Sequence, residues 1–98
     1  MAKFKFTNSA VKDLSDIWEY TTKFWSEKQA EKYYRLIIQD CTELAKNPQT
    51  GKDYSEIYPK LLGQKTSRHI IFYRLIDKST IEITRILHER MDLKNRLK

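Results

Sequence analysis

The chain has 98 residues, of which 40% are hydrophobic and 12% aromatic, with only two glycines and two prolines. This composition is typical of one small globular domain with a single core, and it excludes a disordered or fibrous chain. The net charge is +6, and its excess lies in residues 60–98, which carry ten Lys or Arg against four Asp or Glu, whereas residues 1–59 carry nine of each. We therefore expect the C-terminal part to face an anionic partner.

The chain begins with a short predicted strand, KFKF, and an amphipathic helix that follows Thr7. Thr7 can cap this helix, because its hydroxyl can accept a hydrogen bond from a free N–H group of the first turn. The apolar positions recur at helical spacing and are Ala10, Leu14, Ile17, Trp18, Thr21, Phe24 and Trp25. The same spacing places Asp13, Asp16 and Glu19 on the opposite, solvent-exposed side of the helix.

A second helix is predicted to begin after Ser26, which has the capping-box spacing to Gln29. Its apolar positions are Ala30, Tyr33, Tyr34, Ile37, Ile38, Cys41, Leu44 and Ala45. The single cysteine, Cys41, lies within this pattern and fits a buried hydrophobic residue better than a reactive thiol. Pro48 ends the helix, and the short link at Ser26 predicts an antiparallel pair of helices.

Three runs rich in β-branched and aromatic residues follow: KLLGQKT at 60–66, HIIFYRLI at 69–76 and TIEITRIL at 80–87. They predict an antiparallel meander, and the tail MDLKNRLK adds one or two basic helical turns. The fold class is therefore α+β in one domain of residues 1–98, with the order β-α-α-β-β-β. The helical pair covers one face of the sheet and leaves the other face partly open.

Three arginines lie on the predicted strands. Arg68 and Arg74 share the parity of Ile70 and Phe72, and Arg85 lies on the next strand. Arginine makes bidentate contacts with carboxylates and phosphates, so the three could line an anion-binding groove on the open face. They could equally be paired with nearby carboxylates or simply solvated, and the sequence leaves both interpretations open.

His88 is the residue that most suggests catalysis, because a histidine side chain titrates near neutral pH. No Ser, Cys or Tyr lies beside it in a recognisable arrangement, and His69 is the only other histidine, so a structural or binding role is favoured and a metal site is poorly supported. The chain also lacks a glycine-rich phosphate loop and the common nucleic-acid-binding motifs. We expect no cofactor and no metal.

The two predicted helices carry more aromatic residues than so small a core can bury. They include Trp18, Tyr20, Trp25, Tyr33 and Tyr34. Some of these rings should remain partly exposed and could anchor a partner helix or peptide. The sequence shows no targeting peptide and no run of about eighteen apolar residues, so we expect a cytoplasmic protein with no membrane contact.

Four segments carry a resemblance to a known family: FTNSAVKDLSDIWEYT, ELAKNPQTGK, HIIFYR and IEITRILHERMDL. Through them the chain resembles the ParE toxins of the ParE/RelE superfamily, which form bacterial toxin–antitoxin pairs. The resemblance implies an inhibitor of DNA gyrase that catalyses no reaction of its own. It also implies a ParD-type antitoxin, a ribbon-helix-helix protein whose disordered C-terminal segment wraps around the toxin and which alone contacts operator DNA.

Two surfaces are predicted for these partners. For toxicity and target binding we predict Arg85, His88, Arg90, Met91, Lys94 and Arg96. For antitoxin binding we predict Trp18, Trp25, Tyr34, Arg68 and Arg74. Both sets follow from the charge asymmetry and from the aromatic helices.

Two other functions remain open. A RelE-like ribosome-dependent messenger ribonuclease would use Arg68, Arg85 and His88, with Lys60 or Lys65 assisting, although no Tyr follows the last strand as the resemblance to RelE would require. A non-toxic protein-interaction domain on the same fold is the second alternative.

Overall fold

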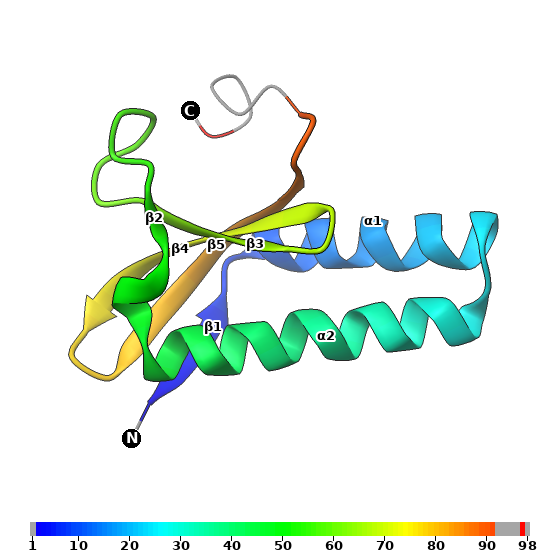
Figure 1. The fold of residues 1–98 in the computed structure, drawn as a ribbon, viewed down its shortest axis with the longest axis horizontal. Helices are drawn as coiled ribbons and strands as arrows, with labels where there is room; N and C mark the ends of the chain where they lie inside the picture. Colours follow the sequence, from blue (N-terminus) through cyan, green and yellow to red (C-terminus); the bar gives the residue numbers. More distant parts are fainter. Residues whose placement is uncertain (1, 92–96, 98) are drawn as a thin grey trace.

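The structure is a computed structural model that describes residues 2–91 and 97. Two antiparallel helices pack on a five-stranded sheet, and the turn that joins them projects beyond the strands (Figure 1). The elements are β1 (Lys3–Phe6), α1 (Asn8–Phe24), α2 (Glu27–Lys46), a 3-10 turn (Pro48–Thr50), β2 (Lys52–Asp53), β3 (Leu62–Thr66), β4 (His69–Asp77) and β5 (Thr80–His88). Neither described helix has the length and apolar character needed to cross a membrane. The predicted helical tail falls largely on residues 92–96 and 98, outside the described residues.

Both helix starts agree with the predicted caps. The Thr7 hydroxyl accepts a hydrogen bond from the backbone N–H of Ala10 at 3.1 Å, and the Ser26 hydroxyl accepts one from Gln29 N–H at 3.0 Å. Each cap satisfies one of the backbone donors that a helix N-terminus leaves without an intrahelical partner. The observed elements, two helices and a five-stranded sheet, confirm the predicted α+β fold with a helical pair.

The sheet is mixed, which corrects the expectation of a purely antiparallel one. The strand order is β1-β5-β4-β3-β2, and β1 runs parallel to β5 while the other pairs are antiparallel. Because both helices and three strands separate β1 from β5 along the chain, no tight turn constrains their relative direction. The alternating pattern of KFKF predicts a strand but carries no information on the direction of its partner.

The link between the helices and β3 differs from the prediction in two ways. Strand β3 begins at Leu62 rather than Lys60, because Lys60 adopts a left-handed backbone (φ 61°) and Leu61 N–H donates to the carbonyl of Tyr58 at 3.1 Å. The additional strand β2 is only two residues long and pairs with the start of β3. Two residues are too few for an alternating pattern to predict.

The main core lies between the helices and the sheet. It is formed by Ala10, Ile37, Cys41, Leu44, Ala45, Ile71, Tyr73, Ile81, Ile83 and Ile86. Cys41 is fully buried, as predicted, and desolvation raises the pKa of its thiol to about 12, so it stays protonated and unreactive. Tyr73 is also fully buried, and its hydroxyl donates to the carbonyl of Pro48 at 2.6 Å.

The opposite face of the sheet carries a smaller apolar cluster. Leu61, Ile70, Phe72 and Leu87 are buried there, and Tyr54 and Leu97 pack against them. Strand β4 therefore contributes to both faces, which explains why its sequence is apolar on both parities. This face is only partly covered, and a groove crosses it.

Candidate functional site

Arg85 is bound to Asp13 of α1, so it belongs to the scaffold of the site. Its Nε and Nη2 atoms donate to the two carboxylate oxygens of Asp13 at 2.7 and 2.9 Å, and the backbone N–H of Ile86 donates to the same carboxylate at 3.0 Å. These hydrogen bonds raise the pKa of Arg85 above its ordinary value. The pair joins the first turns of α1 to the second half of β5.

The placement of Asp13 corrects the sequence prediction, which put it on the solvent side of the helix. Asp13 is buried, with 9% of its surface exposed, whereas Asp16 and Glu19 are exposed as predicted. Helical periodicity assigns Asp13 to the polar side, but that side of α1 faces the unpaired edge of β5 beyond Ile83. A bidentate arginine and a backbone N–H compensate the cost of burying the carboxylate.

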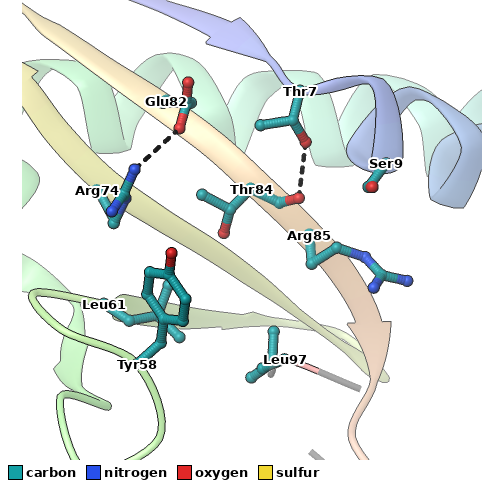
Figure 2. Close-up of a pocket in the computed structure, with 9 residues that line it drawn as sticks. All are labelled: Thr7, Ser9, Tyr58, Leu61, Arg74, Glu82, Thr84, Arg85 and Leu97. Carbon is teal, nitrogen blue, oxygen red and sulfur yellow. Dashed lines mark hydrogen bonds and ion pairs between the residues drawn. The ribbon is translucent and has the colours of Figure 1, made fainter. Parts of the chain in front are cut away.

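The groove on the open face lies between the start of α1, the β4–β5 pair and the loop after β2 (Figure 2). Its volume is about 310 Å³, and it is lined by Thr7, Ser9, Tyr58, Leu61, Arg74, Glu82, Thr84, Arg85 and Leu97. Arg74 and Glu82 stand directly opposite each other on β4 and β5, with Nη2 and Oε1 3.5 Å apart. The Arg74 guanidinium also lies 5.5 Å from the centre of the Tyr58 ring. Arg74 is therefore held in the groove by one carboxylate and one aromatic face.

The prediction that three arginines share one sheet face is wrong for Arg68. This residue lies in the turn between β3 and β4, where its side chain is exposed and its carbonyl accepts a hydrogen bond from Glu89 N–H at 2.9 Å. The parity argument failed because the strands end at Thr66 and begin again at His69, so alternation does not extend to residue 68. Of these three arginines, Arg74 and Arg85 line the groove, and in Figure 2 the Arg85 side chain points away from Arg74.

His88 lies beside His69, which in turn contacts Tyr33, and the sequence did not associate either residue with it. It is paired across the β4–β5 hairpin with His69, and the two rings meet edge to face with their centres 5.3 Å apart. The Tyr33 hydroxyl of α2 is 2.6 Å from His69 Nδ1 and donates to the carbonyl of Thr66 at 3.1 Å. Which of the two groups donates in the 2.6 Å contact depends on the tautomer of the His69 ring.

Burial keeps His69 neutral. Desolvation, followed by the neighbouring His88, lowers the pKa of His69 to about 4, although Asp13 and Glu89 oppose the shift. Glu89 in turn forms an ion pair with Lys65 at 2.9 Å, which lowers the pKa of the Glu89 carboxyl. The Tyr33–His69–His88 group therefore connects α2 with β4 and β5 at the end of the sheet opposite the β4–β5 turn.

This arrangement predicts a stability that depends on pH through His69. The His69 imidazole has its ordinary pKa of 6.5 in the unfolded chain and a pKa of about 4 in the folded one. The contribution of the neutral ring to the free energy of unfolding is therefore fully present above about pH 6.5 and is lost as the pH falls towards 4. Because the ring is partly solvated, we expect a loss of about 1 kcal/mol between pH 7 and pH 5. Urea unfolding at both pH values should show this loss in the native protein and a smaller one in His69→Gln. An identical pH dependence in the two proteins would contradict the assignment.

The other residues predicted for toxicity lie just beyond β5. The backbone N–H of Arg90 donates to His88 Nδ1 at 3.1 Å, and the side chains of Arg90 and Met91 are exposed. Lys94 and Arg96 lie outside the described residues. His88, Arg90 and Met91 thus form a continuous stretch at the end of the strand.

The aromatic residues predicted for antitoxin binding are spread along the helical pair. Trp18 is half-buried and meets Tyr34 edge to face, with ring centres 6.1 Å apart, while Trp25 at the end of α1 is 71% exposed. Phe24 and Tyr20 are also exposed, and their rings contact each other at a tilt of 41° with their centres 4.7 Å apart. The expectation that some rings remain exposed is confirmed.

Within residues 2–91 and 97, no group of three His, Cys, Asp or Glu side chains is arranged to hold a metal ion. The site is thus defined by two features of the described chain. One is the groove with Arg74 and Glu82, and the other is the end of β5 with the two histidines.

The sequence of the chain is similar to those of several known proteins. A sequence profile described as "ParE toxin of type II toxin-antitoxin system, parDE" matches residues 4–93. The toxin ParE1 of Mycobacterium tuberculosis (strain CDC 1551 / Oshkosh) is 32% identical over 96 residues, which are 98% of this chain and 98% of that protein. The toxin ParE of Escherichia coli is 33% identical over 97 residues, which are 99% of this chain and 94% of that protein.

Two solved structures share the fold. A chain of the chromosomal ParDE toxin–antitoxin system from P. aeruginosa superposes with a TM-score of 0.76 at 20% identity, covering 90% of this chain and 96% of that chain. A chain of the toxin–antitoxin complex RelBE2 from Mycobacterium tuberculosis superposes with a TM-score of 0.68 at 18% identity, covering 90% of this chain and 98% of that chain.

Proposed function

Because the chain belongs to the ParE toxin family of type II toxin–antitoxin systems, we propose that it poisons DNA gyrase and that a ParD-type antitoxin neutralises it. The observation that carries the proposal is a match to ParE toxins along nearly the whole chain. Stabilising a DNA-cleaved gyrase would require a binding surface rather than a catalytic group of the toxin. The proposal places the protein in the bacterial cytoplasm, where gyrase acts.

The geometry favours this function over messenger cleavage. A RelE-like reaction was predicted to use Arg68, Arg85 and His88 together. Arg85 is bound by Asp13, Arg68 stands on an exposed turn, and the Nδ1 atom of His88 accepts a backbone hydrogen bond. A general acid or base needs a partner group and a positioned substrate. Because Arg85 is already bound to Asp13, the three residues are poorly suited to hold a substrate or to assist proton transfer.

The antitoxin is the partner best supported by the comparisons, since the two solved structures described above come from toxin–antitoxin systems. We propose a ribbon-helix-helix antitoxin whose disordered segment folds over the open sheet face and the exposed aromatic residues. Binding of this kind can cover a large surface with one flexible segment. Operator DNA would be contacted only through the antitoxin.

One experiment separates the candidate functions. The protein is expressed in bacteria, and gyrase-linked DNA breaks are compared with messenger cleavage in the same cells. Gyrase poisoning predicts DNA breaks that disappear when gyrase is replaced by a resistant form, with intact messengers. Ribosome-dependent messenger cleavage would support the RelE-like alternative, and unaffected growth would support a non-toxic interaction domain.

Removing the residues after Met91 tests which part of the chain contacts the target. This truncation leaves β5 and the His69–His88 pair whole, whereas removal after Leu87 would cut β5 within its last residue pair. We expect toxicity to fall by at least about tenfold, since interface residues of this kind contribute about 1–3 kcal/mol. Antitoxin affinity should fall by a smaller factor, through the loss of Leu97 from the lining of the groove. Full toxicity of the shortened protein would show that the tail, with Lys94 and Arg96, is not part of the target surface.

A further inference from the structure

The groove on the open face combines an apolar floor with a wall that carries the Arg74–Glu82 ion pair. Leu61 and Leu97 line it, and the fully buried Phe72 lies in the same apolar cluster. Its polar groups include Arg74 and Glu82 of the β4–β5 pair and Ser9 at the start of α1 (Figure 2). A ligand with an anionic side chain next to an aliphatic one would be complementary to this groove.

The two arginines of the groove differ in what they can offer a ligand. Asp13 binds Arg85 with two short hydrogen bonds, whereas Arg74 meets Glu82 through a single contact of 3.5 Å. The side chains of Arg74 and Glu82 are 38% and 29% exposed, so both are accessible from solvent. A long, partly solvated ion pair is weak and readily exchanged. Arg74 is therefore the arginine that can change partners.

The start of α1 adds to the positive potential at the same place. Thr7 and Ser9 line the groove, and the first turn of this 17-residue helix contains no acidic side chain. The Thr7 cap satisfies the N–H group of Ala10, while a helix N-terminus presents several such donors and a partial positive charge. Together with Arg74, this end of α1 favours a carboxylate over a neutral or cationic group.

We propose that the groove binds a glutamate or aspartate side chain from the disordered segment of the antitoxin, with an adjacent aliphatic residue against Leu61. The inference rests on the proposed function, in which an antitoxin segment covers the open face. The occupant is a protein carboxylate because the chain carries a net charge of +6 and its excess lies in the half that contains Arg74. On binding, Arg74 exchanges Glu82 for the carboxylate of the partner.

This exchange gives Glu82 a defined role as an internal competitor. In the free toxin Glu82 partly neutralises Arg74, and an incoming carboxylate is repelled by it. Removing the negative charge of Glu82 should therefore tighten antitoxin binding, while removing Arg74 should weaken it. Opposite effects of two residues that contact each other would not arise from loss of packing.

The test measures antitoxin affinity by calorimetry for the native toxin, Arg74→Met and Glu82→Gln. Arg74→Met should bind about tenfold more weakly and Glu82→Gln about threefold more tightly, as expected for a partly solvated charge pair. Lys46→Gln and Glu43→Gln each remove one charge of an exposed ion pair at the end of α2 and should stay within about twofold of the native affinity. Thermal unfolding of each variant verifies that the fold is retained.

A second measurement tests the groove without the antitoxin. The peptide acetyl-Leu-Glu-Leu-amide should shift the backbone amide resonances of Ser9 and Arg74, and acetyl-Leu-Gln-Leu-amide should not. If the antitoxin binds the native toxin but neither Arg74→Met nor Glu82→Gln changes its affinity, the groove proposal is wrong while the toxin–antitoxin function stands. If no antitoxin binds, the proposed function fails. If the two peptides shift the amide resonances equally, the groove proposal is wrong whatever the function of the protein.

Discussion

Replacing Asp13 with alanine should lower the free energy of unfolding by about 3 kcal/mol, the largest effect that we expect from one substitution. Removing one member of a buried ion pair leaves the other charge without compensation, which typically costs about 3–5 kcal/mol, and partial exposure of Arg85 places this case at the lower end. The backbone N–H of Ile86 loses its acceptor as well. For a domain of this size the midpoint of thermal unfolding should fall by about 12–24 °C.

Calorimetry or urea unfolding measures this loss of stability and compares it with that of two other variants of the protein. Asp16→Ala breaks only an exposed pair with Lys12 and should cost less than about 0.5 kcal/mol. The double variant Asp13→Asn, Arg85→Met removes both charges and keeps an acceptor for Ile86, so it should recover about half of the loss. If Asp13→Ala and Asp16→Ala unfold alike, Asp13 does not have the structural role assigned to it.

Replacing Gly51 with alanine should cost about 2–3 kcal/mol, the second largest expected effect. A Cβ atom at Gly51 would lie 2.2 Å from the hydroxyl oxygen of Tyr73 and 2.8 Å from the ring carbon that bears it. Tyr73 is fully buried, and the carbonyl of Pro48 holds its hydroxyl, so the ring has little room to move. Overpacking of this kind typically costs about 1–3 kcal/mol, and the hydrogen bond to Pro48 would be strained too.

Tyr73→Phe distinguishes a steric cause from an effect on the turn itself. Alone it should cost about 1 kcal/mol, because Pro48 loses a donor. Combined with Gly51→Ala it should cost less than the two single losses together, since the closest clashing atom is gone. Gln49→Ala, in the same turn but exposed, should be nearly neutral. Strict additivity of the Gly51 and Tyr73 changes in urea unfolding would contradict the steric explanation.

Much of the fold could be predicted because its signals are local. The caps at Thr7 and Ser26 and the end of α2 before Pro48 each depend on residues within four positions of one another. The contacts that build the site are long-range. Asp13 and Arg85 lie 72 positions apart, and Tyr33 and His69 lie 36 apart, so periodicity within one element cannot join them.

Some of the site could have been found from the sequence. Once the β4–β5 turn is placed between Asp77 and Thr80, pairing outward along an antiparallel hairpin suggests that His69 lies near His88. The pairing in the middle of the hairpin was not predictable, because the register shifts between Leu75 and Asp77 and shifts back between Phe72 and Tyr73, so that Arg74 faces Glu82 instead of Ile83. These shifts belong to an irregular stretch of strand that the alternating pattern of β5 does not reveal.

The same α1 contacts that hold Arg85 also hide an open strand edge. Strand β1 pairs with β5 only as far as Ile83. Beyond that residue the Thr7 hydroxyl donates to the carbonyl of Thr84, and Asp13 accepts from Ile86 N–H, so helix side chains occupy positions that a neighbouring strand would otherwise fill. An unpaired edge can recruit strands from other molecules and lead to aggregation. Loss of Asp13 would therefore expose the protein to self-association through β5 as well as to unfolding.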